Sequence, residues 1–293
     1  MPNLSRRILL GHGAIAGALF GMGRAAAQSI ATPPADGGTR QEAMARPAPG
    51  ATAASGAAQA TPDKLIEDLV AANRILVDQG VLDGYGHVSV RHATDPDRFW
   101  MARSLAPELV TPADVLEHDL EGEARDARGA TLYLERFIHG AIYRARPEVR
   151  AVVHSHAPSL IPFGISGVPL RPVYHMSGFL GGAVPVFDIR AAAGETDMLV
   201  RTPALGRALA RVLGAHPVVL MRGHGAVIVG PDLPHAVFRS VYTEVNARLQ
   251  AQAMTLGKRI TYLDAGEARR AESSLDATIK RPWELWRRKA LGK

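Results

Sequence analysis

The stretch Ala151-Val-Val-His-Ser-His-Ala157 constrains the fold more than any other part of the sequence. An apolar run leads into two histidines that are separated by one residue. Side chains at positions i and i+2 of a β-strand point to the same face, so a strand here would place His154 and His156 side by side. Two imidazoles on one face of a rigid strand supply half of a metal site. The alternative is a pair of ordinary polar positions on a strand.

The absence of cysteine limits what the other half of such a site can be. The chain has 293 residues and no cysteine, which excludes disulfides and cysteine-ligated zinc. A transition metal would therefore be held by histidine and carboxylate side chains, a ligand set that suits Zn, Mn, Fe or Co. The length allows one large domain, with or without a tail.

The basic charge of the chain does not indicate nucleic-acid binding. Arg6, Arg7 and Arg24 lie within residues 1–27, which contain no acidic residue. Without these three arginines the formal net charge of +6 falls to +3, from 31 basic and 28 acidic residues. The remaining basic residues are dispersed, except for Arg287-Arg288-Lys289 near the C-terminus. We therefore expect a small-molecule partner and no nucleic acid.

Residues 1–27 have the pattern of a signal peptide. Ser5-Arg6-Arg7-Ile8-Leu9-Leu10 resembles the twin-arginine export motif, and Ala25-Ala26-Ala27 offers a cleavage site after an apolar stretch. The alternative is a membrane anchor, but this stretch is rich in Gly and shorter than the roughly 20 residues that span a bilayer. We expect export to the periplasm, cleavage near Ala27 and no membrane attachment afterwards.

The composition divides the rest of the chain into three parts. Residues 28–60 are rich in Ala, Pro, Gly, Thr and Ser, and such a segment buries too little apolar surface to order itself, so we expect a disordered linker. Residues 61–260 carry the patterns of a folded domain. Residues 261–293 form a polar tail, in which the spacing of Trp283 and Trp286 suggests a docking helix.

Hydrophobic periodicity predicts a mixed α/β domain. Strands and helices alternate irregularly, and the hairpins favour a largely antiparallel sheet covered by helices. No G-x-G-x-x-G follows a strand, which excludes a Rossmann oxidoreductase. The predicted helices are 61–79, 134–146, 158–167, 202–213 and 233–257, and the predicted strands are 87–91, 99–102, 149–156, 184–188, 218–221 and 226–229.

Two further residues are candidates for the same metal site. His224 lies in Gly223-His-Gly225 between two apolar runs, where flanking glycines allow a sharp turn; the alternative is a surface histidine in a hairpin. Glu135 begins a helix that leads into the His154 strand, and antiparallel packing of the two would return Glu135 to the histidine end. Its alternative is a solvated acid in the first helical turn. His139 lies four residues after Glu135 and suits a supporting or packing position better than that of a ligand.

These motifs together resemble the class II aldolase/adducin family over about Leu65 to Leu256. The resemblance rests on Glu135-Arg-Phe-Ile-His139, Ile142-Tyr143, Arg146-Pro147, Ala151-Val-Val-His-Ser-His156 and Gly223-His-Gly225. It implies that His154, His156 and His224 bind a divalent metal, usually zinc, and that Glu135 is a fourth ligand or the general acid/base. It also implies a three-layer α/β/α fold with a central, mostly antiparallel sheet, assembled as a homotetramer with the active site at a subunit interface.

The chain departs from the sugar-phosphate aldolases of this family at two places. Those enzymes carry Gly-Asn where this chain has Gly86-His87, and small hydroxyl residues where it has Tyr133-Leu134. The missing hydroxyl donors argue against a phosphorylated substrate.

Other side chains near the expected site suit a carboxylate substrate. Arginine binds carboxylates in a bidentate manner, although each arginine here has the alternative of pairing with a surface acid. Tyr174 and His175 lie near where the family places a tyrosine proton donor from a neighbouring subunit. The candidate substrate contacts are His87, Ser89, Arg91, Arg103 and Ser104.

The variant pattern resembles the decarboxylase branch of the family, which acts on carboxylated hydroxymuconic semialdehydes or dihydroxyphthalates. The resemblance implies a metal-dependent carbon–carbon lyase that decarboxylates a small hydroxy-carboxylate or hydroxyaromatic acid through a metal-stabilised enolate. Glu135, Tyr174 or His175 would then protonate the carbanion. The alternatives are an aldolase for an unphosphorylated substrate and a non-catalytic, adducin-like binding module.

Overall fold

The computed structural model describes residues 62–127, 129–257 and 259–292. The expected signal peptide and linker lie outside these residues. None of the described helices combines the length and the apolar character that crossing a bilayer requires.

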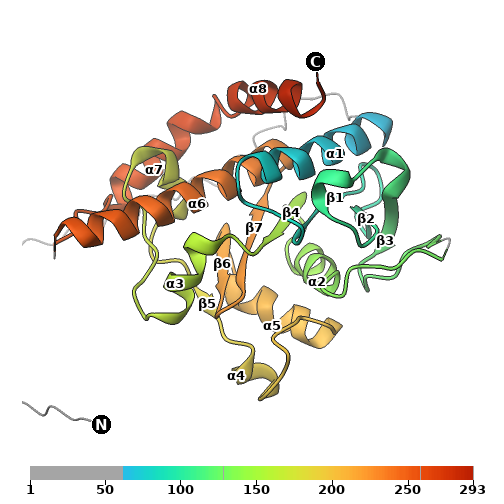
Figure 1. Ribbon diagram of the computed structural model, residues 1–293, viewed down its shortest axis with the longest axis horizontal. Helices are drawn as coiled ribbons and strands as arrows, with labels where there is room; N and C mark the ends of the chain where they lie inside the picture. Colours follow the sequence, from blue (N-terminus) through green and yellow to red (C-terminus); the bar gives the residue numbers. More distant parts are fainter. Residues whose placement is uncertain (1–61, 128, 258, 293) are drawn as a thin grey trace, which may run out of the picture. The chain divides into compact units, whose positions relative to one another are not determined.

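A seven-stranded sheet forms the centre of the fold (Figure 1). Its order is β3-β2-β1-β4-β7-β6-β5, and every neighbouring pair is antiparallel except β5 and β6. This confirms the predicted α/β class with a mostly antiparallel sheet. The strands are β1 (His87–Arg91), β2 (Arg98–Ala102), β3 (Val115–Asp119), β4 (Ala151–Ser155), β5 (Val186–Phe187), β6 (Val218–Met221) and β7 (Gly225–Gly230).

Helices cover both faces of the sheet and make the three layers. Figure 1 shows α1 and α6 side by side on one face and α2 and α5 on the other. Side chains alternate along the strands, so Val153 packs towards α1 and α6, whereas Val152 packs towards α2 and α5. The helices are α1 (Pro62–Asp78), α2 (Phe137–Ala145), α3 (Ile161–Ile165), α4 (Arg190–Ala193), α5 (Pro203–Leu213), α6 (Leu233–Leu256), α7 (Ala265–Asp276) and α8 (Lys280–Ala290).

Three local predictions differ from the structure. Strand β3 was not predicted. Strand β4 ends at Ser155, so His156 lies just after the strand rather than on it. Helix α2 begins at Phe137, and Glu135 lies in the turn before it. The side chain of Leu134 is half exposed and offers little packing that would extend the helix backwards.

The C-terminal tail forms two helices, α7 and α8, where one was expected. Trp283 of α8 is buried against the core, and Trp286 lies next to Tyr242 of α6. Arg287 ties α8 to α1 through ion pairs with Glu67 at 2.8 Å and Asp68 at 2.6 Å. Residues 265–290 therefore pack as part of the described fold.

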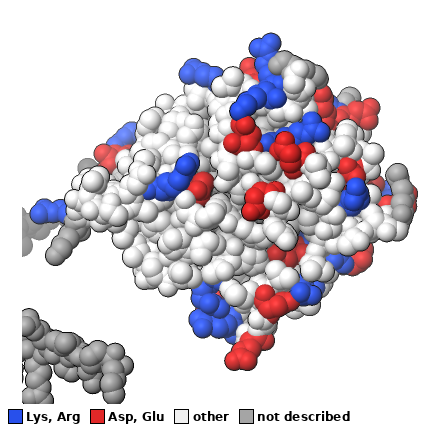
Figure 2. All heavy atoms as spheres, in the orientation of Figure 1, with Lys and Arg blue, Asp and Glu red and all other residues white. Residues whose placement is uncertain are grey.

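Charged side chains on the described surface are mostly interspersed. Figure 2 shows acidic and basic residues near one another on one face. Arg98, for example, lies 3.2 Å from Glu117, and Arg222 lies 2.8 Å from Asp188. Partly exposed surface pairs of this kind contribute about 0–1 kcal/mol each, so the fold rests mainly on its two apolar layers.

Contact between α2 and α5 depends on Gly206. A Cβ atom at this position would lie 2.3 Å from the carbonyl oxygen of Phe137. Glycine to alanine in a helix ordinarily stabilises by about 0.5–1 kcal/mol, but overpacking costs about 1–3 kcal/mol. We expect Gly206→Ala to lower the free energy of unfolding in a urea titration, whereas Gly182→Ala, which meets no atom within 4 Å, should change it little. Equal stability of the two variants would contradict this packing.

His235 joins the start of α6 to the end of α7. Its Nδ1 lies 2.6 Å from Asp232 and its Nε2 lies 2.9 Å from Asp276. Burial lowers the pKa of His235, but these two carboxylates outweigh burial and raise it above its ordinary value.

The raised pKa predicts a pH-dependent contribution to stability. The contribution is fully present below the unfolded-state pKa of about 6.5 and is lost as the pH rises through the folded-state pKa. We expect His235→Gln to cost about 0.5–1 kcal/mol at pH 6 and less at pH 9, as measured by urea unfolding. His216→Gln is the control; a His235→Gln cost that is equal at both pH values would refute the prediction.

Candidate metal centre

Four side chains converge at one end of strand β4. Glu135, His154, His156 and His224 each offer one ligand atom, and these atoms lie within 4.8 Å of one another. The Nε2 atom of His156 lies 3.0 Å from that of His154 and 3.1 Å from that of His224. Oε2 of Glu135 lies 3.3 Å from His154 Nε2 and 3.4 Å from His224 Nε2. Three segments of the chain that are separate in sequence, those of Glu135, of His154 and His156, and of His224, thus form one cluster.

Backbone carbonyls turn the histidine lone pairs into the cluster. Nδ1 of His154 lies 3.2 Å from the oxygen of Ala226, and Nδ1 of His224 lies 3.0 Å from that of Met198. A carbonyl only accepts, so each Nδ1 carries a hydrogen, and in the neutral ring each Nε2 presents a lone pair. Because these lone pairs point into one cluster, they favour a cation between them.

The spacing of the ligand atoms fits a divalent metal. In a tetrahedral site with Zn–N of about 2.1 Å, ligand atoms are about 3.4 Å apart. The shortest separations among the four ligand atoms are 3.0–3.4 Å. The donor set and its spacing therefore suit zinc, and imidazole with carboxylate also accommodates Mn, Fe or Co.

The protonation states of Glu135 and His156 suit metal binding, whereas a proton on His224 would compete with the metal. Burial would raise the pKa of Glu135, but the imidazoles of His154 and His224 lower it below its usual range, so the carboxylate is ionised. Burial and the neighbouring histidines lower the pKa of His156 to about 4, so its imidazole is neutral at pH 7. Burial lowers the pKa of His224, but Glu135 and the carbonyl of Met198 outweigh it and raise that pKa.

Comparison with known proteins assigns the chain that carries this centre to a family. The family model described as "Class II Aldolase and Adducin N-terminal domain" matches residues 67–251, which include all four cluster residues. The chain belongs to the class II aldolase and adducin family. This confirms the resemblance read from the sequence motifs.

Individual relatives agree with this assignment. The decarboxylase tropJ of Talaromyces stipitatus is 38% identical over 244 residues, covering 75% of this chain and 92% of the relative. The 3,4-dihydroxyphthalate decarboxylase of Rhodococcus jostii is 28% identical over 66% of this chain and 82% of its own length. The solved L-fuculose 1-phosphate aldolase of Glaciozyma antarctica superposes with a TM-score of 0.66 at 26% identity, over 79% of this chain and 91% of the aldolase.

Among the predicted substrate contacts, His87 lies beside the cluster. It pairs with His154 across β1 and β4, and the centroids of the two rings are 5.0 Å apart. Its Nδ1 lies 2.6 Å from Nε2 of His139, which α2 supplies. Burial lowers the pKa of both His87 and His139 well below the ordinary value. His139 contacts none of the ligand atoms by a hydrogen bond in the described residues, which fits the supporting position proposed for it.

Ser89 and Arg91 bond to protein groups outside the four-residue cluster, and their predicted contact with substrate stays a prediction. The Ser89 hydroxyl is fully buried between His139 and Tyr143. Arg91 is 3% exposed and donates to four backbone carbonyls, those of Pro96, Tyr143, Arg146 and Val149. These bonds occupy the guanidinium at the end of β1 opposite His87. The alternation of apolar and polar residues in a strand does not predict whether a polar side chain faces a helix or a pocket.

Arg103 and Ser104 have no contact with the cluster in the described residues. Arg103 Nε forms an ion pair with Asp114 at 2.8 Å, which is the surface pairing weighed as its alternative. The backbone N–H of Ser104 donates to the carbonyl of Thr131.

Tyr174 and His175 also lie apart from the cluster within the described chain. The ring of Tyr174 contacts His175 and Tyr242 of α6, and its hydroxyl is buried without a hydrogen-bond partner among the described residues. No described hydrogen bond, ion pair or ring contact joins either residue to Glu135 or the three histidines. A contribution from them to the site of a neighbouring subunit stays a prediction.

The sequence did not reveal the backbone segment that anchors two of the four cluster residues. The carbonyl of Met198 accepts from His224, and the N–H of Val200 donates to Oε1 of Glu135 at 2.9 Å. Met198 has a φ of 69°, a conformation that costs a non-glycine residue about 1–3 kcal/mol. Backbone groups carry no side-chain signal, so only the fold identifies them. Tyr85 was also missed: its ring centroid lies 6.2 Å from that of His156.

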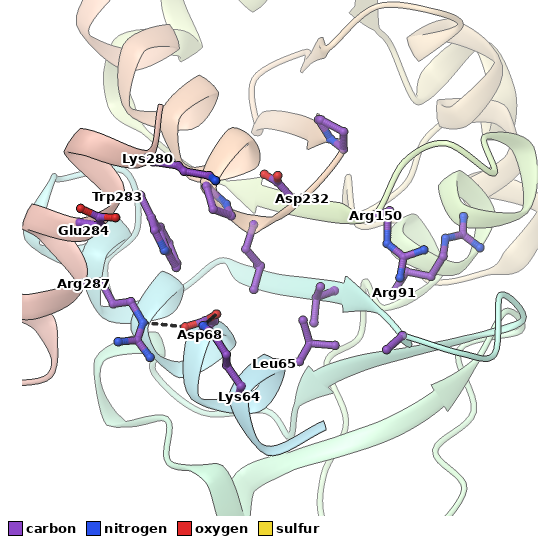
Figure 3. Close-up of a pocket in the computed structure, with 15 residues that line it drawn as sticks. Lys64, Leu65, Asp68, Arg91, Arg150, Asp232, Lys280, Trp283, Glu284 and Arg287 are labelled. Atoms are coloured by element: carbon purple, nitrogen blue, oxygen red, sulfur yellow. Dashed lines mark hydrogen bonds and ion pairs between the residues drawn. The ribbon is translucent and has the colours of Figure 1, made fainter. Parts of the chain in front are cut away.

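A separate hollow of about 790 Å³ lies away from the metal centre. Figure 3 shows Arg91 and Arg150 at one end of it and Trp283 and Lys280 of α8 at the other. None of the four cluster residues lines it. The position of Arg91 at this hollow places its side chain away from the candidate metal centre.

Proposed function

We propose that this chain is a divalent-metal-dependent lyase that decarboxylates a small hydroxy-carboxylate or hydroxyaromatic acid, with zinc as the expected metal. The observation that carries the proposal is the convergence of three histidine Nε2 atoms and the Glu135 carboxylate in one cluster. The named decarboxylases among the relatives support the choice of reaction, and their family supports a lyase.

The side chains of the cluster could supply both metal binding and proton transfer for such a reaction. His154, His156, His224 and Glu135 would hold the metal, which supplies a Lewis acid for the negative charge that develops on substrate oxygen. Decarboxylation breaks the bond between the substrate carbon and its carboxylate carbon, and the electron pair stays on the substrate until a proton adds there. Glu135 would be either the fourth ligand or the general acid/base that transfers this proton. The bond from Val200 N–H to Oε1, with Oε2 facing the cluster, supports either role.

The residues before Glu135 support an unphosphorylated substrate. The hydroxyl of Tyr133 already donates to the carbonyl of Leu105 at 2.6 Å, and Leu134 is apolar. These two positions offer no free hydroxyl for a phosphate. Since decarboxylase chemistry requires a carboxylate on the substrate, a hydroxylated carboxylic acid fits both observations.

The direct test is a product assay on a panel of hydroxy-carboxylates and hydroxyaromatic acids, including 3,4-dihydroxyphthalate, set against unphosphorylated aldols. We expect stoichiometric CO2 release that chelation stops and zinc or manganese restores. Release of aldehyde alone would instead establish the aldolase alternative, which the similarity to a solved aldolase favours. A metal-free chain without turnover would indicate the adducin-like binding module.

We further propose that the chain is exported to the periplasm and assembles as a homotetramer. The Arg6-Arg7 motif supports twin-arginine export, and family membership supports the assembly. We expect the mature N-terminus near Gln28 and an Arg6→Lys/Arg7→Lys variant that stays in the cytoplasm. An uncleaved, cytoplasmic wild type would refute export.

For the assembly, light scattering should give four times the mass of the mature chain. A monomeric mass would refute the tetramer.

A further inference from the structure

A buried chain of hydrogen bonds extends away from the candidate metal centre between β1 and α2. His87 Nδ1 lies 2.6 Å from His139 Nε2, His139 Nδ1 lies 2.6 Å from Ser89 Oγ, and Ser89 Oγ lies 2.7 Å from the hydroxyl of Tyr143. All four side chains are at most 4% exposed. Buried polar groups require hydrogen-bond partners, so the position of each hydrogen in this series of hydrogen bonds depends on its neighbours.

The hydroxyl hydrogen of Tyr143 determines which group donates in each of these hydrogen bonds. In the described residues, Ser89 Oγ is the side-chain acceptor within hydrogen-bond distance of this buried hydroxyl. When Tyr143 donates to Ser89, the Ser89 hydroxyl donates to Nδ1 of His139. His139 then carries its own hydrogen on Nε2 and donates it to Nδ1 of His87.

The same direction determines the tautomer of His87. With Nδ1 accepting, the hydrogen of its neutral ring lies on Nε2. No described hydrogen bond uses this Nε2, while the ring lies 5.0 Å from that of His154 and 4.6 Å from that of Tyr133. A neutral N–H donor is thus available beside the metal centre.

We propose that Tyr143, Ser89 and His139 form a one-way relay that holds His87 as its Nε2–H tautomer, so that His87 donates a hydrogen bond to an anionic oxygen of the substrate. The substrate contact rests on the proposed function, whereas the tautomer does not. His139, Ser89 and Tyr143 are positioning residues. A neutral donor suits decarboxylation because it orients a carboxylate without the strong ground-state stabilisation of a full cation.

The relay is tested on the full-length chain labelled with 15N-histidine, by two-bond 15N–1H correlation spectra that distinguish Nε2–H from Nδ1–H rings. We expect wild-type His87 to carry its hydrogen on Nε2, and Tyr143→Phe to mix its tautomers. Tyr242→Phe, the matched control, should leave them unchanged. Ser89→Ala breaks the relay at a second point should Tyr143→Phe fail to fold. An Nδ1–H ring in the wild type, or a tautomer unaffected by either variant, would overturn the relay.

The substrate contact is tested with 2-hydroxybenzoate as the probe and with the substrate found in the product assay. We expect 2-hydroxybenzoate to shift the His87 Nε2–H signal, and His87→Phe to raise KM about 10- to 100-fold, the value of one hydrogen bond to a charged group. His87→Gln, which keeps a donor, should recover most of this loss. Equal KM for His87→Phe and the wild type would overturn the contact. Should no substrate be found, the proposed function fails while the tautomer result still decides the relay.

Discussion

Replacing Glu135 by glutamine is expected to lower kcat by about 10²- to 10⁴-fold, the usual value of one acid/base group. The amide oxygen of glutamine can still accept from Val200 N–H, so the side chain should keep its place. Its NH2 group would then face the Nε2 atoms of His154 and His224, where the carboxylate oxygen now lies. An amide is neither an effective acid nor an effective base at neutral pH and carries no negative charge, so both properties of the Glu135 carboxylate would be lost.

Glu244→Gln is the matched control for this variant. Glu244 is as buried as Glu135, at 5% against 6% exposed, but belongs to α6 and is not one of the four cluster residues. Its burial raises its pKa, so the neutral amide is a mild change there. Steady-state kinetics should separate the two variants by orders of magnitude. Near-wild-type kcat in Glu135→Gln would remove Glu135 from the proposed chemistry.

Removing the metal should lower the melting temperature by about 8–16 °C. A ligand present at 1,000 times its Kd stabilises the native state by about 4 kcal/mol. For a domain of this size, each kcal/mol corresponds to about 2–4 °C. The expected stabilisation is large because the cluster joins three separate segments of the chain. In addition, Nε2 lone pairs that face one another without a cation repel.

Differential scanning fluorimetry with and without a chelator measures this shift. His154→Ala should melt at the same temperature in both conditions, because it has lost a central ligand. His216→Ala, a histidine outside the cluster, should respond to the chelator like the wild type. A wild-type melting temperature that is indifferent to both chelator and added zinc would contradict a resident metal.

The candidate ligands were predictable because each lies in a local pattern with its own signal. His154 and His156 follow an apolar run, glycines flank His224, and Glu135 precedes an amphipathic helix. The order of these motifs then indicated the family, and the family fold predicted the central, mostly antiparallel sheet. Hydrophobic alternation also placed most strands and helices within a few residues of their observed ends.

The residues that support the ligands were harder to predict, for two physical reasons. Met198 and Val200 act through backbone groups, so no side chain marks them. Ser89 and Arg91 alternate with Val88 and Val90 on a strand that is buried on both faces. Their polar character suggested a pocket, whereas their partners lie on α2 and on nearby backbone carbonyls. Only the packing of α2 on β1 distinguishes these possibilities.

The metal content of the purified full-length chain is the most direct test of a metal centre at Glu135, His154, His156 and His224. Plasma mass spectrometry should find about one divalent transition metal per chain in the wild type and in His216→Ala, with zinc the expected ion. His154→Ala should contain almost none. A wild-type chain without stoichiometric metal, or a His154→Ala variant that retains it, would contradict the proposed centre.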